Sequence, residues 1–304
     1  MTAQPARLAT ELPLLGLLAL FWGSSYLFVG VAVHDIPPAT LVAVRVTIAA
    51  ILLSVILWLR GDRLPRDRRT WGMLLVQACC NSIISWTLLA WGQQYVDSSL
   101  AAVLNSTAPL WVLLITVLVT RHEHLGGRRL AGALLGICGV VLIVGTDALA
   151  GLGQQVAGQL AALFGAMLYG VGAIYGRRFG HISPLATATG TMIWAVAWMV
   201  PVSLAVDRPW TLQPGLPAIA AATALGLFCT GCAMMLYFRL VRTLGSLGVA
   251  SQAYLRSGIG VMLGVVVLGE TITPVVGLGL AAAILGVMLI NVPFERLLRR
   301  RQPA

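Results

Sequence analysis

Three polar residues lie within apolar stretches long enough to cross a membrane, and they offer the most specific chemistry in this chain. Asn105 lies near the middle of one stretch, while Gln252 and Arg256 lie one helical turn apart in another. Polar groups in hydrocarbon are costly, so they usually face a bundle interior or a water-filled path. No Asp or Glu lies at the middle of any stretch. Arg256 therefore favours an anionic ligand such as a substrate carboxylate, with helix carbonyls freed by Pro109 as the alternative partner.

The other candidate contacts are amide, hydroxyl and aromatic side chains. Gln77, Asn81 and Ser85 are spaced by four residues and predict one polar stripe on a helix. Tyrosine rings could line a cavity and stack on planar or cationic ligands. The three selected tyrosines are Tyr26, Tyr169 and Tyr237. Hydrogen bonding between helices is the alternative role for the amides, and a place in the interfacial belt is the alternative for the rings.

Arg45 is the second arginine inside an apolar stretch. It lies seven residues from the outer end of the stretch 38–59, close enough for its guanidinium to reach the membrane surface. We therefore expect Arg45 to be a structural anchor rather than a substrate contact.

Helices that cross a bilayer must position these residues. The chain has 304 residues, of which 59% are hydrophobic and 10% charged, with a mean hydropathy of +0.90. A helix needs about 20 apolar residues to span the hydrocarbon. Ten such stretches occur, at 13–33, 38–59, 72–91, 99–119, 129–145, 157–175, 183–205, 218–238, 247–268 and 273–292. We expect the first to be a membrane span and not a cleaved signal peptide.

The chain contains an internal repeat. Residues 99–145 recur at 246–292 with a constant shift of 147, which places Asn105 on Gln252. We therefore predict an all-α membrane protein of ten transmembrane helices in two five-helix repeats, 1–148 and 149–304. Because five is odd, the two copies would be inverted relative to each other, as in many secondary transporters.

The arginines predict the orientation of these helices. Of the 20 basic residues, all arginine, 17 lie on alternate connections and termini, and the opposite connections hold only Arg208. This asymmetry follows the positive-inside rule and places both termini in the cytoplasm. We interpret the net charge of +10 as a determinant of topology and expect no nucleic-acid partner.

Several chemistries are excluded or disfavoured. Without any lysine there is no Walker A loop and no Schiff base. The five cysteines lie inside apolar stretches, so we expect packing roles, with no metal, no cofactor and no disulfide. Glu123 and Glu270 lie at the ends of stretches, which disfavours a buried proton relay. The small-residue pattern Gly132-x3-Gly136 matches Gly279-x3-Ala283 and predicts internal packing more than a dimer face, so we expect a monomer.

Several short motifs resemble the drug/metabolite transporter superfamily, EamA type. They are Trp22-Gly23, Pro37-Pro38 followed by Arg45, Pro109, and Leu268-Gly269-Glu270 followed by Gly286-Val287. The resemblance covers the whole chain and implies ten helices, cytoplasmic termini and transport of small metabolites, often outward. Within this superfamily, we expect similarity to the aromatic amino-acid exporter branch, for which no separate motif stands out. One departure is that Arg256 stands where the family pattern tends to repeat the proline of the Pro109 helix.

These observations together predict a secondary transporter of the bacterial inner membrane. It would export small metabolites by alternating access, amino acids with aromatic or neutral side chains above all. Arg256 would hold the carboxylate, with Asn81, Asn105 and Gln252 as hydrogen-bonding groups. Export of cationic drugs or other small organic solutes is the alternative. No catalytic pair lies within the stretches, so we do not expect an enzyme.

Overall fold

A computed structural model describes residues 5–115, 127–149, 153–237, 239–240 and 252–291. This part of the chain is helical and holds no strand. The longer α-helices of the first half are α1 (Pro5–Val33), α2 (Pro38–Leu59), α3 (Arg68–Ala78), α4 (Ile84–Gly92), α5 (Ser98–Ser106), α6 (Ala108–Ile115) and α7 (Gly127–Leu149). Those of the second half are α8 (Gly153–Gly176), α9 (Pro184–Val206), α10 (Leu216–Gly226), α12 (Gln252–Leu268) and α13 (Pro274–Asn291).

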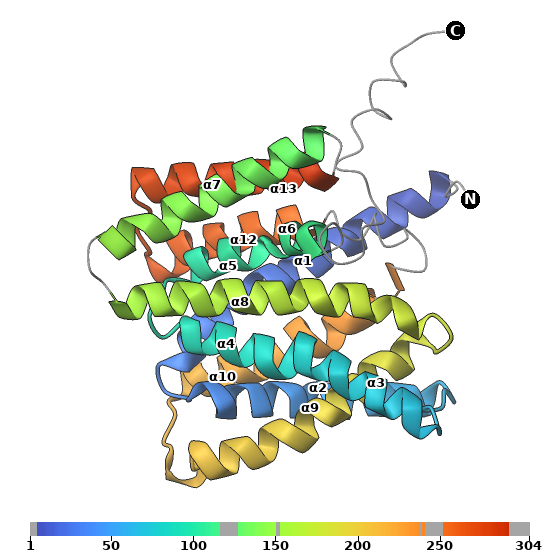
Figure 1. Ribbon diagram of the computed structural model, residues 1–304. Coiled ribbons are helices and arrows are strands. Elements are labelled where there is room, and N and C mark those ends of the chain that lie inside the picture. Colours follow the sequence, from blue (N-terminus) through green and yellow to red (C-terminus); the bar gives the residue numbers. More distant parts are fainter. Residues whose placement is uncertain (1–4, 116–126, 150–152, 238, 241–251, 292–304) are drawn as a thin grey trace, which may run out of the picture.

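The helices lie alongside one another in a single bundle (Figure 1). α7 and α13 form one edge, α9 lies at the opposite edge, and α8 crosses between them. The closest neighbours often come from opposite halves of the sequence: α13 packs on α7, α2 on α9, α1 on α12, and α4 on α8. The interface between the two halves therefore runs through the whole bundle.

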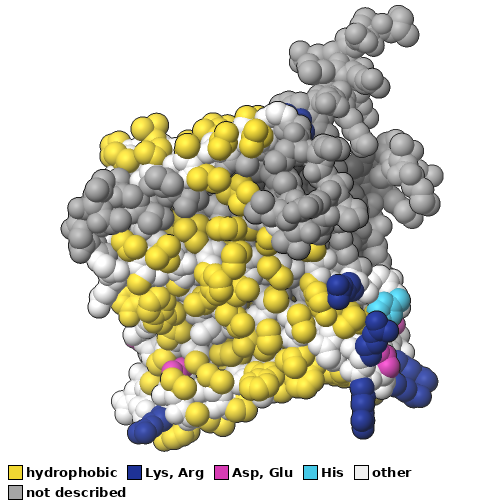
Figure 2. Space-filling model, viewed as in Figure 1, with side chains coloured by type: hydrophobic (Ala, Val, Ile, Leu, Met, Phe, Trp, Pro, Cys, Tyr) yellow, Lys and Arg dark blue, Asp and Glu magenta, His cyan; other side chains and the backbone are white. Residues whose placement is uncertain are grey.

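The surface has the character expected for contact with lipid. Six helical segments of the described chain are long and apolar enough to cross a membrane. Large apolar side chains lie exposed on them, among them Trp58 and Leu216 at 78% and 79% exposure. Figure 2 shows hydrophobic side chains spread over the middle of one face, with basic side chains gathered toward one end. These features support a multi-pass membrane protein.

One of the predicted spans is interrupted close to a proline. The stretch 99–119 divides into α5 and α6 at Thr107, two residues before Pro109, which has no N–H to continue the helical ladder. The hydroxyl groups of Ser106 and Thr107 donate to the carbonyls of Val103 and Leu104, at 2.7 Å and 2.6 Å. The helix is therefore interrupted beside Pro109, and local hydroxyls supply hydrogen bonds at the break.

Two π-helical segments occupy matching places in the two copies. η1 (Cys79–Ile83) joins α3 to α4, and η5 (Leu227–Cys232) follows α10, at a separation close to the 147-residue shift of the repeat. At each segment a side-chain hydroxyl donates to the backbone carbonyl five residues earlier. The Ser85 hydroxyl donates to the Cys80 carbonyl, and the Thr230 hydroxyl donates to the Leu225 carbonyl. Such segments are frequent at functional sites.

Carboxylates from one half cap helix starts in the other half. Glu270 accepts from the backbone N–H groups of Ser98 and Ser99 at the start of α5. Asp207 accepts from the backbone N–H of Thr40 in the first turn of α2, at 2.6 Å. Asp35 accepts from the N–H of Gly215, which precedes α10, at 3.0 Å. Asx and Glu side chains suit these positions because helix N-termini carry free N–H groups and a partial positive charge.

Backbone contact joins α7 to α13. A Cβ placed on Gly139 would come within 2.5 Å of the Ala283 nitrogen, and one on Gly286 within 2.5 Å of the Gly136 nitrogen. Gly132 and Gly136 are buried on this side of α7, while Leu134 and Ile137 are exposed on the other. The prediction that the small-residue pattern serves internal packing is confirmed for this pair of helices.

Candidate functional site

Tyr26 and Asn105, predicted separately from the sequence, are in direct contact. The Asn105 amide nitrogen donates to the Tyr26 hydroxyl at 2.6 Å, and both residues are buried. The Asn105 carbonyl oxygen is buried without a hydrogen-bond partner among the described residues. An acceptor of this kind is costly when left empty, so Asn105 could accept a hydrogen bond from a polar ligand.

Gly23 and Gly260 allow α1 and α12 to approach closely beside this pair. A Cβ on Gly23 would meet the Ile259 side chain at 2.8 Å and the Arg256 carbonyl oxygen at 2.9 Å. A Cβ on Gly260 would meet Ala102 of α5 at 2.7 Å and the Tyr26 ring at 3.2 Å. Helices α1, α5 and α12 thus meet around Tyr26, and they come from both copies.

Arg256 lies at the same crossing, on α12. Its side chain is half-buried, and its Nε atom is buried without a hydrogen-bond partner in the described chain. Its Cζ atom lies 6.0 Å from the centre of the Trp22 ring, which in turn packs on Tyr237 at 5.4 Å between ring centroids. Arg256 therefore faces aromatic rings, and no carboxylate within the described residues pairs with it.

Arg45 differs from the expectation of an anchor that reaches the membrane surface. Its side chain is only 7% exposed, and its Nε donates to the hydroxyl of Thr230 in η5 at 2.7 Å. Its Cζ atom lies 3.8 Å from the centre of the Trp86 ring in α4. The prediction that Arg45 reaches the membrane surface is wrong. The Thr230 hydroxyl, in the π-helical segment, and the face of the Trp86 indole hold the guanidinium inside the bundle.

Tyr169 is connected to the same group of residues. The Trp86 indole N–H donates to the Tyr169 hydroxyl, so one indole contacts Arg45 through its face and Tyr169 through its edge. Tyr169 and Arg45 therefore share Trp86 as a common neighbour.

The predicted stripe of Gln77, Asn81 and Ser85 is present, and it faces α8. A Cβ on Gly172 would come within 3.4 Å of the Asn81 carbonyl oxygen and 3.5 Å of the Gln77 amide nitrogen. The Ser85 hydroxyl contacts the carbonyl oxygen of Gly165 at 3.2 Å. These contacts favour packing between helices for Ser85, whereas the buried Gln77 carbonyl oxygen has no partner in the described part of the chain.

Gln252 begins α12, but its side chain lies outside the described residues. The predicted pairing of amides at Asn105 and Gln252 is therefore not tested. Glu123, which the 147-residue shift aligns with Glu270, also lies outside the described residues.

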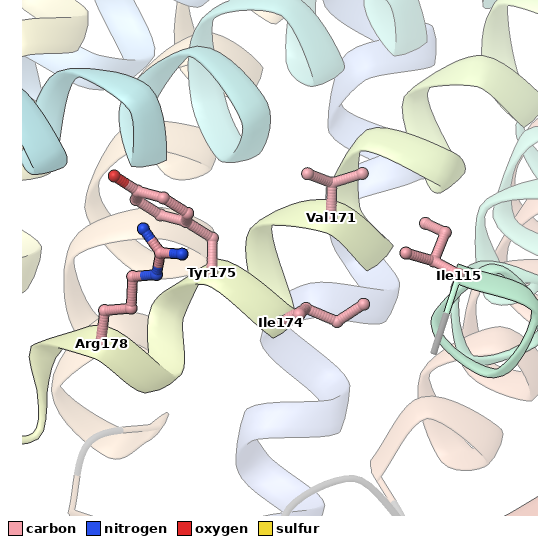
Figure 3. Close-up of a pocket in the computed structure, with 5 residues that line it drawn as sticks. All are labelled: Ile115, Val171, Ile174, Tyr175 and Arg178. Carbon is pink, nitrogen blue, oxygen red and sulfur yellow. The ribbon is translucent and has the colours of Figure 1, made fainter. Parts of the chain in front are cut away.

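An open groove lies elsewhere, between the end of α6 and the last turns of α8. Its volume is about 140 Å³, and it is lined by Ile115, Val171, Ile174, Tyr175 and Arg178. Figure 3 shows Arg178 beside Tyr175 at one end of the groove, and the Arg178 Cζ lies 4.9 Å from the centre of that ring. None of the predicted contacts lines this groove, so it is distinct from the candidate site.

Comparison with known proteins identifies the family. Residues 11–145 and again 156–292 match the EamA-like transporter family. The chain belongs to the EamA-like transporter family. The expected resemblance is thereby confirmed, whereas similarity to the aromatic exporter branch is not tested. Membership points to a transporter and not to an enzyme.

Relatives of this EamA-like protein match along nearly their full length. The "Uncharacterized inner membrane transporter YedA" of Escherichia coli K12 is 29% identical over 92% of this chain and 91% of its own. The "Uncharacterized transporter YoaV" of Bacillus subtilis is 24% identical over 93% and 98%. A "Probable terminal-alkyne amino-acid exporter" of Streptantibioticus cattleyicolor is 26% identical over 95% and 94%.

A solved crystal structure shares the fold of this EamA-like chain. The two superpose with a TM-score of 0.65 at 20% sequence identity, over 97% of this chain and 99% of the other. At that identity the likeness supports the fold alone.

Sequence reasoning missed the part of the site around Arg45. Trp86 was not among the selected aromatic residues, and Thr230 carried no signal because its place depends on the π-helical turn. The signal that was available is the cost of a buried arginine, which applied to Arg45 as much as to Arg256.

Proposed function

We propose that this EamA-like protein exports small carboxylate-bearing metabolites across the bacterial inner membrane, above all amino acids with aromatic or neutral side chains. Two relatives support the direction and setting of the proposal: YedA is named an inner membrane transporter, and the protein of Streptantibioticus cattleyicolor is named an amino-acid exporter. The guanidinium of Arg256, which no carboxylate among the described residues pairs with, is the observation that carries the substrate class.

The proposed architecture is ten membrane helices in two inverted copies, 1–148 and 149–304, acting as a monomer with both termini in the cytoplasm. The remaining helices, α5 with α6, α7, α12 and α13, would add four spans to the six apolar segments. The first residues of α1 and the last of α13 lie at the same end of the bundle (Figure 1), as an even number of crossings requires. Alternating access would come from rocking of the copies around the site between them.

Arg256 is the proposed carboxylate-binding group. A guanidinium keeps its charge at any working pH and offers paired N–H donors that match a carboxylate. Asn105 supplies an unpartnered acceptor next to Tyr26. Trp22 and Tyr237 pack together near Arg256. Together these groups form a polar end and an aromatic wall, which suit an aromatic amino acid.

Efflux of radiolabelled phenylalanine from proteoliposomes tests the proposal. Wild-type protein should move phenylalanine faster than empty liposomes, and Arg256→Ala should lose most of this rate, because it loses the charge-assisted contact. Arg178→Ala is the matched control, since Arg178 also stacks on a ring but lies outside the site. Unchanged transport by a correctly inserted Arg256→Ala protein would remove Arg256 from the site.

A quaternary ammonium compound in the same assay tests the alternative cargo. Arg256 near the Trp22 ring should repel a cation that would otherwise stack there. Faster efflux of the cation than of phenylalanine, unaffected by Arg256→Glu, would support drug export instead.

A further inference from the structure

Arg45 presents free hydrogen-bond donors inside the bundle. Its Nε is committed to Thr230, but its two terminal nitrogens form no hydrogen bond with the described residues. The whole side chain is only 7% exposed. The guanidinium is therefore held in place by one end while the other end stays available.

The surroundings of Arg45 provide orientation without a counter-charge. Trp86 and Thr230 are buried at 4% and 0% exposure, and they fix the plane and one edge of the guanidinium. No carboxylate in the described chain pairs with Arg45. Removing a charge from water without a partner is costly, so an anion that reaches the free edge would gain a large part of that energy.

Tyr169 adds a second donor, and it contacts the same indole as Arg45. Its hydroxyl already accepts from the Trp86 indole, so the hydroxyl hydrogen remains available to a ligand oxygen. Arg45 stacks on the face of the same indole, which places the two groups in the same neighbourhood. A guanidinium edge and a phenol O–H together offer donors only, which is the chemistry of an anion site.

We propose that Arg45 and Tyr169 form a second carboxylate-binding site on the transport path, separate from Arg256. This inference rests on the proposed function, because the ligand is the carboxylate of the exported metabolite. The two guanidiniums belong to different copies, Arg45 to α2 and Arg256 to α12. Each copy thus contributes one group that binds the same class of anion.

Thermal unfolding in detergent isolates the Arg45 site. In an Arg256→Gln background, benzoate should raise the unfolding temperature while its neutral analogue benzamide does not. Adding Arg45→Gln should abolish the benzoate shift, whereas adding Arg45→Lys should keep part of it and adding Arg178→Gln should keep all of it. The absence of a benzoate shift in Arg256→Gln, or its survival in the Arg45→Gln double variant, would overturn the proposal.

Chemical modification gives a second readout that needs no variant. Phenylglyoxal reacts with accessible arginines, and mass spectrometry of the peptides reports each site. In wild-type protein, benzoate should slow the modification of Arg45 several-fold more than benzamide does, with Arg178 unaffected by either. Equal modification of Arg45 in both solutions contradicts the proposed site, even if the double variant fails to fold.

Phenylalanine efflux separates this inference from the proposed function. Arg45→Gln should weaken the apparent affinity for phenylalanine by roughly tenfold or more, the loss expected for a charge-assisted hydrogen bond. Normal efflux by Arg45→Gln would sink the second site while leaving the exporter intact. An Arg45-dependent benzoate shift without any phenylalanine efflux would sink the proposed substrate and retain the anion site.

Discussion

Glu270, which follows α12, binds the start of α5: the backbone N–H of Ser98 donates to its carboxylate at 2.7 Å, and that of Ser99 does so at 2.9 Å. A carboxylate at a helix N-terminus is favourable because it meets free N–H groups and the positive end of the helix dipole. The contact links the two copies of the repeat through backbone atoms, so no particular side chain is required on α5.

Replacing Glu270 should weaken this link in proportion to the acceptors lost. Glu270→Ala removes both hydrogen bonds and should cost about 1 kcal/mol, the typical value of a helix cap. Glu270→Gln keeps one carbonyl acceptor without the charge and should fall between Glu270→Ala and the wild type. Melting temperatures in detergent provide the measurement, and identical values for all three proteins would contradict the capping role.

Gly139 should not tolerate even one methyl group. Its Cβ position lies within 2.5 Å of the Ala283 nitrogen and 2.6 Å of the Gly279 carbonyl oxygen, so Gly139→Ala must push α7 and α13 apart. Gly258→Ala on α12 is the matched control, since nothing lies within 4 Å of that position. We expect a clear drop in the yield of monodisperse protein and in melting temperature for Gly139→Ala only. Equal behaviour of the two variants would argue against the close contact.

Thr230 should be more important than an ordinary membrane threonine. Its hydroxyl accepts from Arg45 and donates to the Leu225 carbonyl, so Thr230→Val removes two hydrogen bonds at nearly constant volume. Each buried bond contributes about 1 kcal/mol, more where a charge is involved. Thr223→Val is the control, because Thr223 makes only an exposed bond to its own helix. The measurements are melting temperature and phenylalanine efflux, and Thr230→Val should lower both.

Asp67 should give one connection a measurable pH dependence. Hydrogen bonds from Thr70, from its side chain and its backbone N–H, lower the pKa of the Asp67 carboxyl from its ordinary 3.8. A lowered pKa in the folded state means that the cap stabilises α3 above about pH 4, and that this contribution is lost as pH falls below it. Asp67→Asn keeps a capping oxygen but cannot titrate. The melting temperature of the wild type should therefore fall more steeply than that of Asp67→Asn between about pH 5 and pH 3.

The helical class and the close small-residue contact were predictable because each has a local signal. Apolar length predicts a membrane helix, and the spacing of Gly132, Gly136, Gly279 and Ala283 predicts a helix crossing. Tyr26 and Asn105 could each be predicted as a candidate, because both lie deep within apolar stretches. The hydrogen bond between them has no signal in the sequence.

The environment of Arg45 could not be predicted, because it depends on two elements that leave no sequence pattern. The π-helical turn at Leu227–Cys232 redirects Thr230 toward α2, and the crossing of α2 with α4 places Trp86 under the guanidinium. Counting residues from the end of a stretch gives depth but not the direction of a side chain. The stripe of Gln77, Asn81 and Ser85 shows the same limit, since its spacing was correct while its partner, α8, emerged only from the fold.

The glycine contact between α7 and α13 restricts how the protein can open. These helices belong to different copies, yet their backbones touch at one edge of the bundle, opposite α9 (Figure 1). Separating α7 from α13 would expose their backbone peptide groups to lipid tails. A small rotation at the glycine contact would keep these peptide groups covered. We therefore expect the two halves to rotate about a hinge along this edge, with the smallest displacement at α7 and α13 and the largest beside α9.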